Sequence, residues 1–207
     1  MANELTHSPE FLRLGIDMDG VLADFNTGWI DRYNERFEKR LRHTDVVQWD
    51  GLHELTHFAT MEAFWEWFQQ DGRSIFRDLP VYPDSIETIE RLARDHRVVI
   101  VSSKFDWAIP DTLEWLAEHR VTAREIHFVH DKTAVACDVY LEDAPYHLQA
   151  LVEKRPDATV CRMVRPWNVP VPGTVDVESW DQFADLVDSL ARHVPGHRAR
   201  LVGDRAP

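Results

Sequence analysis

Short, mostly apolar runs recur along the chain and predict buried β-strands. The first covers residues 11–16, and a β-branched run follows at 98–101. Three more cover residues 126–129, 137–141 and 159–164. Runs that are apolar on both faces are typical of parallel strands covered by helices on each side. The pattern therefore predicts a parallel sheet buried between two helical layers.

Segments with apolar residues at spacings of three and four separate these runs and predict amphipathic helices. They cover residues 84–93, 110–119, 145–151 and 179–193. Alternation of strands with helices is typical of βαβ units, in which crossover helices join successive parallel strands. The fold class predicted from this pattern is α/β, with a Rossmann-like doubly wound parallel sheet.

Residues 26–75 interrupt this alternation, because they are rich in aromatic and charged residues and show no strand pattern. Two groups of large apolar residues recur there at helical spacing: Trp29, Ile30, Tyr33 and Phe37, then Met61, Phe64, Trp65 and Phe68. We interpret the segment as a small helical cap inserted after the first strand. Residues 1–25 and 76–207 would then form the α/β core.

The length and hydrophobic fraction of the chain fit one globular core, and its net charge argues against one class of binding partner. The chain has 207 residues, 44% of them hydrophobic, and a formal net charge of −13. A protein that binds a nucleic acid polymer should be basic, so this charge argues against one. It leaves a nucleotide substrate open, because a bound cation inverts the local field.

The sequence shows neither an export signal nor a membrane span. It lacks a positively charged start followed by an apolar segment, and its apolar runs are too short to cross a bilayer. Cys137 and Cys161 lie in apolar, strand-like contexts. We expect buried free thiols and a soluble cytoplasmic protein without a membrane partner, although the sequence leaves a disulfide open.

Two aspartates, Asp17 and Asp19, directly follow the first strand, and Gly20 comes next. Open α/β sheets bind ligands at the carboxyl ends of their strands. Close carboxylates repel, so this pair requires a cation, a shared proton or ample water. A hard divalent cation with oxygen ligands fits, and Mg²⁺ is the usual one. Gly20 would let the chain turn sharply beside such a ligand.

Polar side chains also follow three other predicted strands. Ser102 and Ser103 end the second run, where hydroxyls can donate to a phosphate oxygen or merely cap the next turn. Lys132 follows the third run, and Glu142 and Asp143 follow the fourth. Because parallel strands end at one edge of a sheet, these side chains are candidates for a shared site.

The run from Asp17 to Phe25, Asp-Met-Asp-Gly-Val-Leu-Ala-Asp-Phe, resembles the first motif of the haloacid dehalogenase superfamily of phosphatases. More closely, it is similar to the 5′(3′)-deoxyribonucleotidase family. Ser102, Lys132 and the pair Glu142-Asp143 match the second, third and fourth motifs, and they occur in the superfamily's order. The resemblance implies the strand order 3-2-1-4-5 with right-handed crossovers.

The resemblance implies a phosphomonoester hydrolase that works through an aspartyl-phosphate. Asp17 would be the nucleophile, and Asp19 would protonate the leaving hydroxyl and then activate water. Ser102 would hold the phosphoryl group, and Lys132 would neutralise the nucleophile and the phosphate.

Magnesium is the implied cofactor. Asp17, the backbone carbonyl of Asp19 and Asp143 would hold it together with water molecules. Glu142 stands where the family has Asp, and this longer carboxylate would support the ligands without binding the ion itself.

The implied substrate is a small phosphorylated molecule, a (deoxy)ribonucleoside monophosphate. A sugar phosphate or another small phosphomonoester is the alternative, because the cap sets substrate choice and matches the family only in general character. The expected substrate contacts are Phe25, Trp65, Trp67, Phe76, Ser103 and His130. Lys104 replaces a common Pro and His130 a usual Arg, so loop shape and selectivity are expected to differ there. The resemblance also leaves a homodimer open.

One motif suggests different chemistry. Residues His53 to His57 match H-E-x-x-H, in which two His on one helix face bind zinc and Glu54 acts as base. The preceding Asp50-Gly51 would start the helix only there, and no third ligand stands at a fixed spacing, so we interpret these as exposed cap residues. A non-catalytic nucleotide-binding relative is a further alternative, which the complete set of motif residues does not favour.

Overall fold

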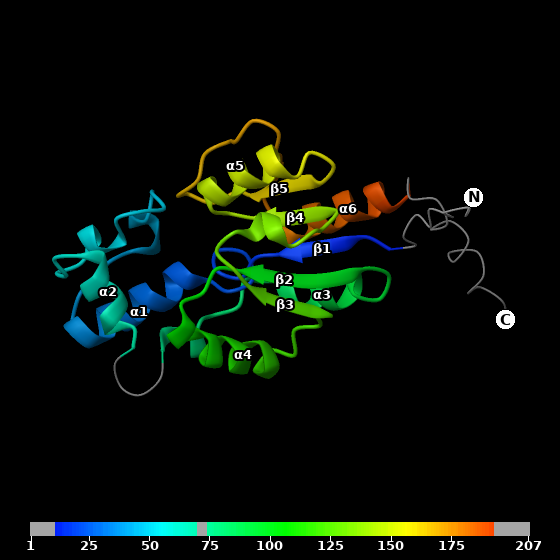
Figure 1. Cartoon of the computed structure of the whole chain (residues 1–207). Helices are drawn as coiled ribbons and strands as arrows, with labels where there is room; N and C mark the ends of the chain where they lie inside the picture. Colours follow the sequence, from blue (N-terminus) through cyan, green and yellow to red (C-terminus); the bar gives the residue numbers. More distant parts are fainter. Residues whose placement is uncertain (1–10, 70–73, 193–207) are drawn as a thin grey trace, which may run out of the picture.

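The computed structural model describes residues 11–69 and 74–192, and its centre is one parallel sheet (Figure 1). The strand order is β3-β2-β1-β4-β5-β6. The strands are β1 (Arg13–Ile16), β2 (Arg97–Ser102), β3 (Glu125–Phe128), β4 (Val139–Glu142), β5 (Thr159–Met163) and β6 (Val175–Val177). The predicted fold class and the order of the first five strands are confirmed. Strand β6 was not predicted, because only three residues form it and two of them are exposed.

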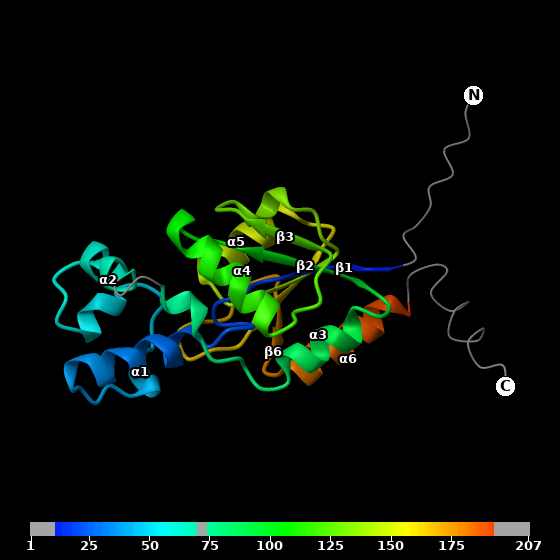
Figure 2. The same ribbon diagram turned by 90° about the horizontal axis from the view of Figure 1, so that it is seen from below.

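Two apolar layers cover the sheet, as the uninterrupted apolar strands predicted. The helices of the core are α3 (Ser85–Leu92), α4 (Ile109–Glu118), α5 (Pro145–Lys154) and α6 (Trp180–Ala191). Val98 and Ile100 of β2 pack in the cluster that includes residues of α3, α4 and α6. Val99 and Val101 pack in a second cluster with residues of α5. Figure 2 shows α3 and α6 side by side, and the two helices are in contact.

The segment between β1 and α3 is helical and lies beyond the carboxyl ends of the strands (Figure 1). It contains α1 (Phe25–Phe37), α2 (Met61–Trp67) and the 3₁₀ turns η1 (His43–Asp45), η2 (Leu52–Leu55) and η4 (Ile75–Arg77). We call the described residues between 26 and 75 the cap. Its interior is aromatic, with buried Trp29, Tyr33, Phe64, Trp67 and Phe68. The predicted domain boundaries remain a prediction, and parts of them lie outside the described residues.

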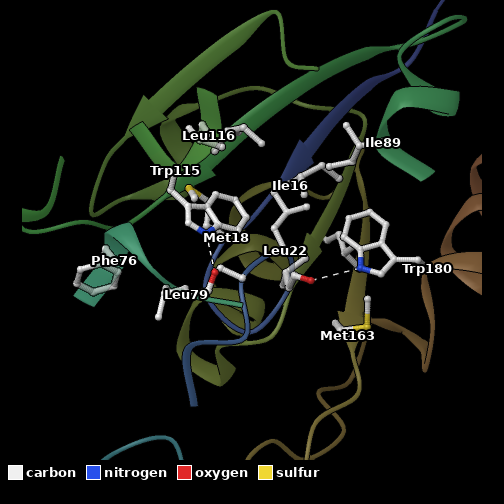
Figure 3. Close-up of a cluster of buried hydrophobic side chains, with 14 of the residues drawn as sticks. Ile16, Met18, Leu22, Phe76, Leu79, Ile89, Trp115, Leu116, Met163 and Trp180 are labelled. Atoms are coloured by element: carbon white, nitrogen blue, oxygen red, sulfur yellow. Dashed lines mark hydrogen bonds between the residues drawn. The ribbon is translucent and has the colours of Figure 1, made fainter. Parts of the chain in front are cut away.

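The loop after β1 is held against the core by its own apolar side chains. Met18 and Leu22 are buried, and Figure 3 shows them among residues of β1, α4 and α6. The Met18 carbonyl accepts hydrogen bonds from the N–H groups of Leu22 and Ala23 at 2.7 and 2.8 Å. The indole of Trp180 donates to the Val21 carbonyl at 3.3 Å. These contacts with the core hold the loop that carries Asp17 and Asp19 in place.

The cysteines are buried free thiols, as predicted, and their reactivity provides a first test of the fold. Burial raises the pKa of Cys137 to about 11 and that of Cys161 to about 12. Because the thiolate is the reactive form, we expect neither thiol to react with Ellman's reagent at about pH 8 until the protein is unfolded. Rapid labelling of either cysteine in the native protein would contradict this packing.

In the part of the chain that the structure describes, no helix is both long and apolar enough to span a membrane.

Candidate active site

The first aspartate is positioned by the sheet itself. Asp17 directly follows β1, and its N–H donates to the Leu141 carbonyl of β4 at 3.0 Å, which holds this residue against the sheet. Gly20 has a φ of +80°, and a Cβ there would lie 2.1 Å from Asp143 Oδ2. Any larger residue would collide with that carboxylate, and most would be strained at this φ. The loop after β1 and the end of β4 are thus in close contact.

A buried lysine joins two of the carboxylates. Lys132 lies in the 3₁₀ turn η6 (Lys132–Ala134), which follows β3 and is capped by the Asp131 carboxylate. Its Nζ lies 2.8 Å from Asp17 Oδ1 and 2.5 Å from Glu142 Oε2. All three side chains are buried. Charges in such a setting interact strongly, because little water screens them.

The electrostatics of this group favour a charged Asp17. Burial raises the pKa of its carboxyl group, but the Lys132 ammonium outweighs burial and brings the pKa below its ordinary value. Burial lowers the pKa of Lys132, whereas the charges of Asp17 and Glu142 outweigh that effect and raise it. Burial and repulsion by Asp17 raise the pKa of Glu142, and the same two causes raise that of Asp143 to about 8. Asp17 is therefore the carboxylate that most readily carries a charge.

The acidic cluster fits a metal ion. Among the described residues, Asp17, Glu142 and Asp143 form the group whose potential ligand atoms all lie within 4.8 Å of one another. Asp143 Oδ1 is buried and has no hydrogen-bond partner in that part of the chain. A buried carboxylate oxygen without a partner is costly unless a cation or a proton meets it. A hard divalent cation would satisfy it with the oxygen ligands that such ions prefer.

Both carboxylate oxygens of Glu142 already have partners within the protein. Its Oε1 accepts hydrogen bonds from the N–H groups of Asp143 and Ala144 at 3.1 and 2.9 Å, and its Oε2 meets Lys132. Glu142 is thus suited to orient the loop that follows β4, and its expected supporting role remains a prediction. Asp17 and Asp143 remain as the carboxylates best placed to hold an ion.

The second aspartate of the motif lies outside this cluster. Asp19 Oδ2 forms an ion pair with Lys104 Nζ at 2.5 Å, while its Oδ1 is buried and has no partner among the described residues. The predicted contact of Asp19 with the metal through its backbone carbonyl remains a prediction.

The zinc-peptidase motif does not form a metal site in the described residues. His53 lies within the turn η2 and His57 follows it, so the two do not share a helix face. The Nδ1 atom of His57 lies 3.0 Å from the Tyr33 hydroxyl. Neither histidine belongs to a group of three or more potential ligands there, which is limited to the carboxylates named above. His53 is also half-buried, not exposed as expected.

Three side chains that follow β5 donate hydrogen bonds to the loop after β1 and to Asp143 after β4. The Trp167 indole donates to Asp143 Oδ2 at 2.7 Å. The Asn168 amide donates to the Asp143 carbonyl at 2.8 Å. Arg165 donates to the Gly20 carbonyl at 2.7 Å. Hydrogen bonds of this kind fix the orientation of a metal-binding carboxylate.

Replacing Trp167 by Phe should therefore weaken metal binding while keeping the aromatic ring. We expect the dissociation constant for Mg²⁺, measured by calorimetry, to rise about tenfold, because Asp143 loses the donor that orients it. Trp115→Phe is the matched control: its indole donates to the Leu79 carbonyl at 2.7 Å, in the core. Equal Mg²⁺ affinity in the Trp167 variant and the wild type would remove Trp167 from this role.

A cavity of about 590 Å³ adjoins the acidic loops, and Asp19, Gly20 and Asp143 line it. Five of the six expected substrate contacts line it as well: Phe25, Trp65, Phe76, Ser103 and His130. Phe25 and Phe76 stack with their ring centroids 5.7 Å apart. The cavity thus joins a charged end to an aromatic wall.

The structure does not support the expected contact of Trp67 with substrate in this cavity. Trp67 is 2% exposed, does not line the cavity, and stacks on Phe58 inside the cap at 5.6 Å. Residues two positions apart on a helix point about 200° apart, so Trp65 and Trp67 cannot face the same space. Since Trp65 faces the cavity, Trp67 faces the interior of the cap.

The two serines after β2 have different surroundings. Ser102 is buried at the end of the strand and does not line the cavity. Ser103 lines it, donates to the Val129 carbonyl at 2.9 Å, and lies 3.1 Å from His147 Nε2. Burial and the Lys132 charge lower the pKa of His147 to about 4, so this histidine is neutral near pH 7.

Sequence reasoning missed several residues of this site. Lys104 was noted only for its effect on the loop. Trp167 and Tyr146, which both line the cavity, were not considered. The position of Trp167 just after β5 could have indicated that it lies near the site, because the carboxyl ends of parallel strands share one edge of the sheet. No local pattern indicated that Lys104 would point toward Asp19.

Similar proteins are known from sequence and from solved structures. Residues 11–194 match the family described as 5′ nucleotidase, deoxy (pyrimidine), cytosolic type C protein. A 5′(3′)-deoxyribonucleotidase of Clostridium acetobutylicum is 27% identical over 147 residues, or 66% of this chain and 75% of that protein. One of Bacillus subtilis is 25% identical over 143 residues, or 66% and 78%. A haloacid dehalogenase-like hydrolase of Streptococcus pneumoniae shares the fold, with a TM-score of 0.60 and 11% identity over 86% of this chain and 98% of that one.

Proposed function

This chain belongs to the 5′ nucleotidase, deoxy (pyrimidine), cytosolic type C family of phosphatases, and we propose that it hydrolyses (deoxy)ribonucleoside monophosphates with Mg²⁺. The observation that carries the proposal is that Asp17, Lys132 and Asp143 lie together, with Asp143 lining the cavity. The ion pair of Asp17 and Lys132 measures 2.8 Å, and potential ligand atoms of Asp17 and Asp143 lie within 4.8 Å of each other. These residues come from three separate strand ends.

The charges of this group suit a phosphate monoester. The ester is an anion, and an attacking carboxylate is a second one, so their repulsion must be offset. Lys132 offsets part of it from a buried position, where its ammonium is poorly screened. When bound at Asp17 and Asp143, Mg²⁺ would neutralise charge on the phosphoryl oxygens. Ser102, at the end of β2, is the proposed hydroxyl donor to the same group.

The proposed chemistry has two steps. An oxygen of Asp17 bonds to phosphorus, and the bond from phosphorus to the ester oxygen breaks with its electron pair on that oxygen. Asp19 gives the leaving oxygen its proton. Asp19 then takes a proton from water, whose oxygen attacks phosphorus and releases inorganic phosphate and Asp17. Burial raises the pKa of Asp19, and the Lys104 charge opposes this.

The shape and lining of the cavity support a nucleotide as substrate. Its volume of about 590 Å³ lies in the range typical of sites for small organic ligands. Phe25, Trp65 and Phe76 supply aromatic faces, on which a base can stack. Relatives in this family carry the name 5′(3′)-deoxyribonucleotidase, which also favours a deoxynucleotide.

A panel of phosphate esters tests the proposal. The panel contains ribo- and deoxyribonucleoside 5′- and 3′-monophosphates, several sugar phosphates and p-nitrophenyl phosphate, each with Mg²⁺ and with a chelator. We expect kcat/KM for at least one nucleoside monophosphate to exceed that of every sugar phosphate by about tenfold or more. Chelation should abolish phosphate release. A preference for sugar phosphates, or release that ignores chelation, would overturn the proposal.

A further inference from the structure

A second buried lysine, Lys104, lies beside Asp19, and the proposed chemistry above does not use it. Its side chain is 1% exposed, and its Nζ lies 2.5 Å from Asp19 Oδ2. The same Nζ lies 3.9 Å from the centroid of the Phe76 ring. Lys104, Asp19 and Phe76 all line the cavity. The lysine therefore sits where the charged end of the cavity meets its aromatic wall.

A buried ammonium group is stable only when its surroundings compensate for lost water. The Asp19 carboxylate and the face of Phe76 provide this compensation. In the described part of the chain, these are the two partners of the Lys104 ammonium. The pair with Asp19 therefore restricts both side chains, since Lys104 has no competing carboxylate within ion-pair distance there.

The two oxygens of Asp19 have different surroundings as a result. Oδ2 is held by Lys104, whereas Oδ1 is buried and has no partner among the described residues. Asp19 itself lines the cavity. Asp19 and Lys104 both line the cavity, so their ion pair sets the position of the Asp19 carboxyl group at the cavity wall.

We propose that Lys104 is a positioning residue, which holds Asp19 by Oδ2 and so fixes the carboxyl group of Asp19 beside the leaving oxygen of the ester. This inference rests on the proposed function, in which Asp19 transfers the proton. It predicts that Lys104 matters most when the leaving oxygen needs that proton. A sugar hydroxyl leaves poorly as an alkoxide, whereas p-nitrophenolate leaves without a proton.

The test compares Lys104→Met with the wild type on two esters, with Mg²⁺ present. We expect the rate of the first step, measured as release of the alcohol within a single turnover, to fall about 100-fold for a nucleoside monophosphate and less than about threefold for p-nitrophenyl phosphate. A merely structural role for Lys104 would lower both rates by the same factor. Equal losses on the two esters, or no loss on either, would overturn the inference.

A double-mutant cycle with Asp19→Asn keeps the test valid if the single Lys104 variant does not fold. The Asp19→Asn, Lys104→Met variant lacks both buried charges, so it leaves no unpaired ion behind. If Lys104 acts through Asp19, adding Lys104→Met to Asp19→Asn should change kcat for the nucleotide less than about twofold. A further loss of tenfold or more would show that Lys104 acts independently of Asp19, against the inference.

Failure of the proposed function and failure of the proposed role of Lys104 give different results. If the wild type releases no phosphate from any ester, the proposed function fails. If the wild type is active and Lys104→Met lacks the dependence on leaving group, only the inference about Lys104 fails.

Discussion

Asp17→Asn is expected to abolish turnover, with kcat on the best substrate of the panel reduced at least about 10⁴-fold. The amide has nearly the shape of the carboxylate but is no nucleophile, and it lacks a charge for the metal. The fold should survive, because Lys132 keeps its second partner, Glu142, at 2.5 Å. Removing the Asp17 charge also relieves part of the repulsion that raises the pKa values of Glu142 and Asp143.

The measurement is kcat together with thermal unfolding of the same preparation. Asp188→Asn is the matched control, since this carboxylate pairs with Arg91 at the surface, 3.1 Å away. We expect the control to keep wild-type kcat, because an exposed ion pair contributes little to stability and lies far from the site. Wild-type turnover by Asp17→Asn would show that another group attacks the phosphate.

Lys132→Met is expected to lower both activity and stability. Lys132 is buried and pairs with Asp17 and Glu142 at 2.8 and 2.5 Å. Without the ammonium, Asp17 either keeps an uncompensated buried charge or takes up a proton and loses its nucleophilicity. Breaking a buried pair of this kind costs about 3–5 kcal/mol of unfolding free energy. We expect kcat to fall about 10³-fold or more, as after loss of an electrostatic partner of the transition state.

The stability of this variant should depend on pH with a definite sign. Burial and the Asp17 charge already raise the pKa values of Glu142 and Asp143, the latter to about 8. A carboxyl group with a raised pKa in the folded state binds its proton more tightly there than in the unfolded chain. Stability therefore falls as pH rises above the unfolded value of about 4. Metal-free Lys132→Met should unfold at lower urea concentration at about pH 8 than at about pH 5.

A second substitution separates the two effects of Lys132. In Lys132→Met, Glu142→Gln, one of the unpaired carboxyl groups becomes a neutral amide. We expect about 1–2 kcal/mol of the lost stability to return, while activity stays at the level of Lys132→Met. Recovery of activity in the double variant would mean that Lys132 serves only to balance Glu142.

The strands and their polar ends could be predicted because both signals are local. A parallel strand between two helical layers is apolar on both faces. The end of the apolar run in the sequence therefore marks the end of the strand. The order of the first five strands then brings Asp17, Lys132 and Asp143 to one edge. Strand β6 escaped prediction because three residues, two of them exposed, carry too little apolar pattern.

The direction of individual side chains could not be predicted in the same way. Helical spacing identified the aromatic residues of the cap, but it did not decide which face of α2 meets the cavity, so Trp65 and Trp67 were both chosen. Lys104 and Trp167 lie in irregular segments, where no period relates sequence to direction. Their partners, Asp19 and Asp143, are distant in sequence, and only the folded chain brings them together.

The proposed catalysis requires a covalent bond between phosphorus and Asp17, and trapping that bond is its most direct test. The enzyme would be mixed with its best nucleoside monophosphate and Mg²⁺, quenched in acid within one turnover, and treated with borohydride. Borohydride reduces an acyl phosphate, so Asp17 should be converted to homoserine, which mass spectrometry of the peptide would locate. Omission of Mg²⁺ should prevent the conversion. Full turnover with Asp17 unmodified, or with the change at another carboxylate, would contradict the account.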